Sequence, residues 1–135
     1  MEVVDWEETP QVCNSIFDGD TVFSNVELKK WTWVETDVFD GKKVHITQKF
    51  TGLSASDFQA FCDDEKKDIG INNDGLTTKN VTCSDNTITE EVIMDDEMVG
   101  MVTPAVMAST ISNVCDYLLN GYATLKDIFF SDEEE

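Results

Sequence analysis

The stretch WTWVETDVFDGKKVHITQKF constrains the fold more than any other part of the chain. Apolar side chains take alternate positions in its first half at Trp31 and Trp33, and in its second half at Val44 and Ile46. This period of two places one set of side chains on a single face of a β-strand. The Asp40–Gly41 pair separates the two halves and is typical of a tight hairpin turn. The sequence therefore predicts an antiparallel hairpin.

In the residues just before this hairpin, the alternating apolar positions shift by one residue. Val26 and Leu28 occupy even positions, whereas Trp31 and Trp33 occupy odd ones. A single flat strand cannot bury both pairs on one face. Either a bulge falls at Lys29–Lys30 or two separate strands are present.

A short helix is predicted close to the N-terminus. Thr9 can cap its first turn, and Pro10 suits the first helical position, where a missing N–H costs nothing. Gly19 would end this helix. Its apolar stripe would consist of Val12, Cys13, Ile16 and Phe17.

A second helix is predicted from Ser54 onwards. Ser54, with Asp57 three residues later, resembles a capping box, and Leu53 and Phe58 fit a hydrophobic staple. Glu65 falls inside the apolar arc of this helix, which predicts that the helix frays or ends near it. The apolar face would consist of Phe58, Phe61, Cys62 and Ile69.

The clearest helix begins with Thr103 as its cap and Pro104 in its first turn, and it ends before Gly121. Its apolar arc covers more than half of the circumference, and Asp116 is its only charged residue. A helix with so few charges is either buried on most sides or lies at a subunit interface, and both alternatives stay open. The candidate interface residues on its centre line are Met107, Ile111, Val114 and Leu118.

Together these segments predict an α+β fold, with a mainly antiparallel sheet of four to six strands packed against two main helices. Two of the strands are expected at residues 79–83 and 87–94. The 135 residues are expected to form one compact domain (1–135), with a short N-terminal arm and an acidic tail at residues 131–135.

The C-terminal segment sets apolar residues directly against acidic ones. Leu125, Ile128 and Phe129 fit one face of a short helix that could dock on the domain. The four acids that follow would stay in solvent and discourage aggregation of the exposed rings.

The net charge of −19 arises from 28 acidic residues against nine lysines, with no arginine. A nucleic-acid-binding protein requires a basic stripe, and an anionic membrane surface would repel this chain. The composition favours a basic protein as the partner, such as one that itself binds nucleic acid. The alternative is that acidity only keeps the protein soluble.

The cysteines are widely separated and form no C-x-x-C pair. No basic leader opens the chain, and no apolar run is long enough to span a bilayer. These features predict free, buried thiols in the cytoplasm, which would be the host cytoplasm for a viral protein. The four residues are Cys13, Cys62, Cys83 and Cys115.

Catalytic motifs are lacking in the sequence. His45 is the single histidine, and no nucleophile elbow, phosphate loop or dinucleotide motif accompanies it. Zinc-ligand spacing is absent, and the NNDG segment at residues 72–75 does not fit an EF-hand loop. The chain is therefore predicted to be non-enzymatic, with no cofactor and no metal site.

Clusters of acids suggest a surface that stands in for phosphates. Asp64 and Asp68, one helical turn apart, can approach the phosphate spacing of DNA. In size and charge the chain resembles small acidic DNA-mimic inhibitors encoded by phages, which implies binding to the nucleic-acid site of a basic protein. The residues of this predicted surface are Asp57, Asp63, Asp64, Asp68, Glu90, Glu91, Asp95, Asp96, Glu97, Asp132, Glu133, Glu134 and Glu135.

A second resemblance gives the alternative function. The segment DGKKVHITQKFTGLSASDFQAF combines a strand, a short loop and a capped acidic helix, and it is similar to the start of phage tail assembly chaperones. This implies a viral structural or assembly subunit, such as a virion component. Such a subunit would self-associate through the helix at residues 104–119.

Overall fold

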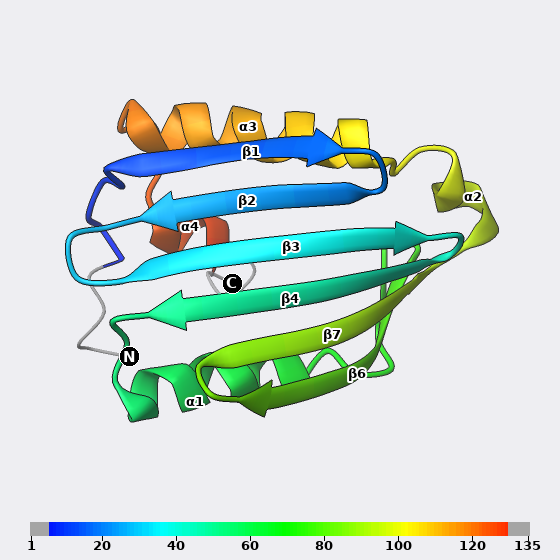
Figure 1. Ribbon diagram of the computed structural model, residues 1–135, viewed down its shortest axis with the longest axis horizontal. Coiled ribbons are helices and arrows are strands. Elements are labelled where there is room, and N and C mark those ends of the chain that lie inside the picture. The colour runs from blue at the N-terminus through cyan, green and yellow to red at the C-terminus, as the bar shows by residue number, and fades with distance from the viewer. Residues whose placement is uncertain (1–5, 130–135) are drawn as a thin grey trace.

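A seven-stranded antiparallel sheet forms the centre of the computed structural model, which describes residues 6–129 (Figure 1). The predicted α+β class is confirmed, but the sheet has seven strands rather than four to six. The spatial order is β1-β2-β3-β4-β7-β6-β5. The strands are β1 (Val12–Asp18), β2 (Thr21–Glu27), β3 (Thr32–Asp40), β4 (Lys43–Thr51), β5 (Asn72–Asn73), β6 (Leu76–Ser84) and β7 (Thr87–Met94). The helices are α1 (Ala55–Lys66), α2 (Asp96–Val99), α3 (Pro104–Leu119) and α4 (Leu125–Phe129).

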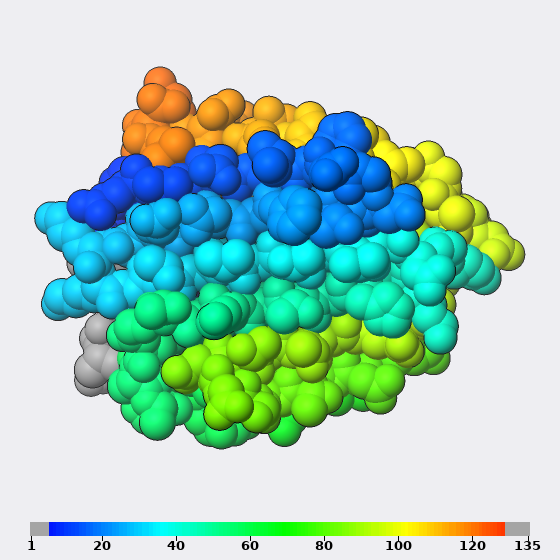
Figure 2. Space-filling model, in the orientation of Figure 1, coloured from blue at the N-terminus to red at the C-terminus, as the bar shows by residue number. Residues whose placement is uncertain are grey.

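The long helices lie on one face of the sheet and leave the other face uncovered. In Figure 1, α3 runs along β1, and α1 lies behind β6 and β7. Figure 2 shows the uncovered outer face, where β1 to β4 and β7 are visible side by side. The antiparallel register places paired residues on the same face. The inner face begins with the row Cys13, Val26, Trp33 and Phe50.

Two hairpins account for the phase change that the sequence shows before residue 31. The turn at Asp40–Gly41 is confirmed, because Asp40 pairs with Lys43 and Gly41 has a φ of 62°. A positive φ at glycine suits a tight hairpin turn. Leu28 and Trp31 close the preceding hairpin, where the Leu28 amide donates to the Trp31 carbonyl at 2.9 Å. Two strands, rather than a bulge, therefore resolve the ambiguity.

The predicted N-terminal helix is wrong, because its residues form β1. This strand pairs with β2 along its whole length, from Val12 opposite Glu27 to Asp18 opposite Thr21. Gly19, with a φ of 59°, lies in the turn between them. The apolar residues that fit a helical stripe also fit a strand, and pairing with β2 overrides the local cap signal.

The predicted starts of α1 and α3 are confirmed. Ser54 Oγ accepts a hydrogen bond from the Asp57 amide at 3.2 Å, and Thr103 Oγ1 accepts one from the Val106 amide at 3.2 Å. The short C-terminal helix is present as α4, and Leu125 is buried. The acidic tail at residues 131–135 lies outside the described residues.

Aromatic rings fill one end of the space between the sheet and the helices. Phe50 and Phe61 stack with their centroids 4.9 Å apart, and Phe58 meets Phe50 edge-on at 6.1 Å. Trp6 contacts Trp31 and Phe61 edge-on, at 6.0 and 5.4 Å. We call these five residues the aromatic end. Buried aromatic pairs of this geometry add to the stability gained from area burial.

The prediction of free thiols is also wrong, because all four cysteines form disulfides. Cys13–Cys115 joins β1 to α3, and Cys62–Cys83 joins α1 to β6. The fold brings together cysteines that lie 102 and 21 residues apart in the sequence. The prediction of a reducing cytoplasm depended on free thiols. Disulfides persist mainly in oxidising compartments, so the cysteines no longer support that prediction. Within residues 6–129, no helix has the length and apolar character needed to cross a bilayer.

Candidate functional site: an acidic pocket beneath the sheet

Polar side chains cross the inner face next to the aromatic end. The register sets Glu35 beside Gln48, Asp37 beside Ile46, and Ile46 beside Glu90. The period of two that turns the apolar residues of β3 and β4 inward carries these polar side chains inward too. Gln48 Nε2 donates to Glu35 Oε1 at 2.9 Å, which gives the Glu35 carboxylate a hydrogen-bond donor.

A further carboxyl group comes from α1. Glu65 follows Phe61 by one helical turn, so the helix face that packs Phe61 into the aromatic end also turns Glu65 inward. The carboxyl groups of Glu65 and Glu90 form a hydrogen bond between α1 and β7. Two ionised carboxylates cannot share a hydrogen bond, so this carboxyl pair must hold a proton.

Glu90 is the protonated partner of the carboxyl pair. Burial raises the pKa of Glu90 to about 9, and the hydrogen bond with Glu65 and the negative charge of Glu65 raise it in the same direction. Burial also raises the pKa of Glu65, but the hydrogen bond from Glu90 opposes that rise. When a protonated acid donates a hydrogen bond to a carboxylate, the bond raises the pKa of the donor and lowers the pKa of the acceptor. Glu90 and Glu65 show this pattern.

Asp37 is the most deeply buried acid that the structure describes. Its side chain has a relative exposure of 0%, and no amide, amine or hydroxyl group of the described chain donates to either carboxyl oxygen. Burial is the main cause that raises the pKa of Asp37 to about 9, followed by the charge of Glu35, a hydrogen bond with Glu35 and the charge of Glu90. Asp37 is therefore a neutral acid near pH 7, and its proton can only be shared with Glu35.

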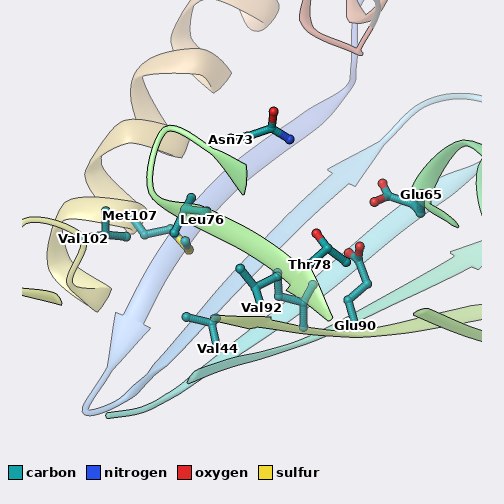
Figure 3. A pocket seen from close by; sticks show the side chains of 10 residues that line it. Val44, Glu65, Asn73, Leu76, Thr78, Glu90, Val92, Val102 and Met107 are labelled. Carbon is teal, nitrogen blue, oxygen red and sulfur yellow. The ribbon is translucent and has the colours of Figure 1, made fainter. Parts of the chain in front are cut away.

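A pocket with a volume of ≈ 250 Å³ opens beside the carboxyl pair. Figure 3 draws Glu65 and Glu90 at one end of the pocket, and Val102 and Met107 at the other. The walls are mostly apolar, and they come from the sheet and from the start of α3. The apolar lining consists of Val44, Ile46, Leu76, Val92, Val102 and Met107, and the polar lining consists of Glu65, Asn73, Thr78 and Glu90.

Basic side chains lie elsewhere on the part of the molecule that the structure describes. Lys42 pairs with Asp96 at 2.7 Å, and Lys67 lies 3.9 Å from Asp64. Neither of these ion pairs includes a carboxyl group of the pocket. Among the residues of the described range, no group of three or more His, Cys, Asp or Glu side chains is placed to hold a metal ion. The site is thus a set of acids without a cation.

The predicted acidic surface is only partly accessible. Asp57 and Glu90 are buried, at 6% and 9% exposure, so their prediction as surface residues is wrong. Each lies on the side of its element that faces the interior. Asp68 and Glu91 are half-buried. The exposed members are Asp63, Asp64, Asp95, Asp96 and Glu97, while Asp132, Glu133, Glu134 and Glu135 lie outside the described residues.

The candidate interface on α3 faces the rest of the domain. Leu118 belongs to the buried core, Ile111 and Val114 pack against that core, and Met107 lines the pocket. The exposed apolar residues of α3 are instead Val106, Tyr117 and Leu119. Packing against the domain accounts for the apolar centre line of α3, but the exposed side of the helix also carries only one charge, Asp116. Self-association stays a prediction.

Sequence reasoning missed Glu35, Asp37, Gln48 and Glu65 as site residues. The sequence did contain one signal for these acids, which is an acidic residue at a position where the periodicity predicts an inward side chain. Glu35 and Asp37 continue the inward phase of Trp33, and Glu65 falls inside the apolar arc of its helix. An acid at an inward position indicates either the end of an element or a functional carboxyl, and the structure shows an inward carboxyl in each case.

Comparison of the chain with protein-family models, with curated proteins and with solved structures finds no match.

Proposed function

We propose that this protein is a non-enzymatic binding protein that holds a small organic molecule in the pocket beneath the sheet. The observation that carries the proposal is the contrast within one interior: the aromatic end is filled, while a pocket of ≈ 250 Å³ stays open beside it. Binding sites for small molecules are typically concave and mostly apolar, with a few polar groups that orient the ligand. The lining of this pocket has that composition.

The arrangement of the polar groups favours binding over catalysis. The two acids of the pocket lining are hydrogen-bonded to each other. In glycoside hydrolases, by comparison, the two catalytic carboxyl groups are about 5 Å or more apart, which leaves room for the substrate or a water molecule between them. Histidine and cysteine, the usual side chains for nucleophilic or base catalysis near neutral pH, do not line the pocket.

Fragment screening by NMR on the 15N-labelled protein tests this function. A set of small neutral, cationic and anionic fragments should shift the amide signals of Ile46, Val92 and Met107. Val102→Trp should abolish these shifts, because an indole ring at the pocket wall would occupy the cavity. Val106→Trp is the matched control, since Val106 lies in the first turn of α3, shortly after Val102, and is 47% exposed. Binding that survives Val102→Trp, or a set in which no fragment binds, would contradict the proposal.

The acidic surface supports a second candidate, binding to a basic protein. The net charge of −19 and the exposed acids of α1 and of the α2 region favour such a partner. Figure 1 shows α1 and α2 at separate places on the molecule, so the partner would have to contact more than one element. The DNA-mimic inhibitor is the narrowest version of this candidate. The disulfides favour an oxidising compartment as its setting.

Salt dependence tests the second candidate. Binding to an immobilised polylysine peptide should weaken steeply as ionic strength rises, because the Debye length falls from about 30 Å at 0.01 M to about 3 Å at 1 M. The triple variant Asp95→Asn, Asp96→Asn and Glu97→Gln should weaken it further. Retention that is the same in molar salt would refute an electrostatic partner surface.

A further inference from the structure

We propose that the ligand of the pocket is a compact amphipathic amine, whose ammonium group binds the carboxyl groups of Glu65 and Glu90 at one end of the lining. This inference rests on the proposed function, since it names the chemical class of molecule that the same pocket takes. Four features of the site support the proposal. They are the buried acids without a basic partner, the separation of polar and apolar lining, the types of side chain that could bind a ligand, and the proton between Glu65 and Glu90.

Among the described residues, no basic side chain forms an ion pair with the acids of the interior. Glu35, Asp37, Glu65 and Glu90 come from three different elements, and the described ion pairs of lysine involve none of them. Asp37 is 0% exposed beside Ile46, which lines the pocket, and within the described part of the chain it has a hydrogen bond only with Glu35, another acid. The hydrogen bonds of these acids come from one another or from Gln48, so no described cation balances the charge that they carry when ionised.

The pocket separates polar from apolar surface. Its acidic end is formed by the carboxyl pair, and its far end is formed by Val102 and Met107 (Figure 3). A ligand that fits has one charged end and a short apolar body. The volume of ≈ 250 Å³ limits this body to a small chain or ring. A longer lipid would exceed the cavity.

The donor set disfavours the other charged ligands. An anion would meet acids and no basic side chain at the polar end. A divalent metal ion prefers six or more oxygen ligands or a tight set of nitrogen and sulfur ligands. The described residues offer no group of three such side chains at one place. An ammonium group needs only two or three acceptor oxygens, which Glu65 and Glu90 supply.

Binding of the amine should release a proton. In the empty pocket, Glu90 donates its proton to Glu65; when the ammonium group enters, that proton leaves to solvent and both carboxylates accept hydrogen bonds from the ligand. The groups around the pair are acidic or neutral: Glu35 and Asp37 from β3, Gln48 from β4, Asp64 from α1, and Asp68 from the turn after α1. Ionising the pair without a cation is therefore unfavourable, and acid should expel the ligand.

Calorimetry with three ligands of matched chain length tests the inference: hexylamine, 1-hexanol and hexanoate. Hexylamine should bind most tightly at pH 8, and its affinity should fall about tenfold for each pH unit towards pH 5 if one proton is released. Repeating the titration in buffers of different ionisation enthalpy should show release of about one proton. The affinity of 1-hexanol should change little with pH.

Variants of the pair complete the test. Glu65→Gln and Glu90→Gln should each remove the preference for hexylamine and the proton release, but keep binding of 1-hexanol. Glu91→Gln is the matched control, because Glu91 follows Glu90 on β7 and lies beside His45 on the outer face. Equal binding of hexylamine and 1-hexanol to the parent chain would overturn the amine while leaving a binding pocket. Tightest binding of hexanoate would also overturn the amine. Failure of all three to bind would overturn both proposals.

Discussion

The two ends of the inner face share the helix α1 and lie on neighbouring parts of one sheet, yet they are filled in opposite ways. At the aromatic end, rings from the sheet, α1 and the N-terminal segment pack at centroid distances from 4.9 Å upwards. At the acidic end, which comprises Glu35, Asp37, Glu65 and Glu90, the carboxyl groups have no described basic partner, and Glu65 and Glu90 line a cavity of ≈ 250 Å³.

The aromatic end stabilises the folded state, whereas the acidic end reduces its stability. An unsatisfied buried polar group costs about 1–3 kcal/mol, whereas a buried aromatic side chain contributes about 2 kcal/mol or more. The packed rings and the two disulfides offset the cost of the acids. Acids that reduce stability and adjoin a cavity are typical of binding sites rather than of scaffolds.

Changing pH should have the largest effect, and it should act on the acidic end. The pKa values of Asp37 and Glu90 are both raised to about 9. The stability that their protonation provides is complete below the pKa values of the unfolded chain, near pH 4, and is lost as pH rises towards 9. Each group changes the free energy of unfolding by about 1.4 kcal/mol per pH unit in that window. Between pH 5 and pH 8, urea unfolding should show a loss of up to roughly 8 kcal/mol.

The double variant Asp37→Asn and Glu90→Gln is the control for that measurement. It cannot ionise at these two positions, so its stability should change much less between pH 5 and pH 8. It should also exceed the parent chain in stability at pH 8. A parent chain that is equally stable at both pH values would show that the two acids are not buried in solution.

Removal of the long-range disulfide should have the next largest effect. Cys13→Ala with Cys115→Ala opens a link across 102 residues, for which the chain-entropy model gives about 4.7 kcal/mol. Cys62→Ala with Cys83→Ala opens a link across 21 residues, and the same model gives about 3 kcal/mol. Chemical denaturation of both double variants measures the difference. A larger loss from the second pair would show that local packing against α1, rather than loop closure, determines the effect.

Truncation at the aromatic end should cost slightly less. Phe61→Ala removes a ring that contacts Trp6, Trp31 and Phe50 and that is only 8% exposed. Loss of a buried phenylalanine costs about 3–5 kcal/mol, because a cavity remains. Thermal and urea unfolding should both report this loss. A change below about 1 kcal/mol would mean that the rings repack without Phe61.

The sequence predicted the features that depend on local pattern. The hairpin at Asp40–Gly41 and the caps at Ser54 and Thr103 follow from turn and cap chemistry over a few residues, and the structure has each of them. The helix predicted after Thr9 failed for a physical reason. Its residues have no local feature that excludes a strand, and the pairing of β1 with β2 decides between the two.

The acidic end could not be predicted because it depends on contacts between distant residues. Glu65 and Glu90 meet only when α1 packs behind the sheet, and Cys13 meets Cys115 only when α3 lies along β1. Periodicity placed Glu65 on the inward side of its helix, but it could not supply the opposing carboxyl. Free thiols were expected for the same reason, since no short spacing links the cysteines.

Truncation in the pocket should have the smallest effect and gives the sharpest comparison of the two ends. Met107→Ala removes a half-buried side chain that lines the existing cavity, so it widens an open space rather than creating a closed void. The cost should be about 1 kcal/mol, well below that of Phe61→Ala, because the cavity contribution is largely absent. Urea unfolding of both variants at pH 6 measures the ratio. Equal losses would mean that Met107 is as tightly packed as the rings, and the difference between a filled end and an open end would then disappear.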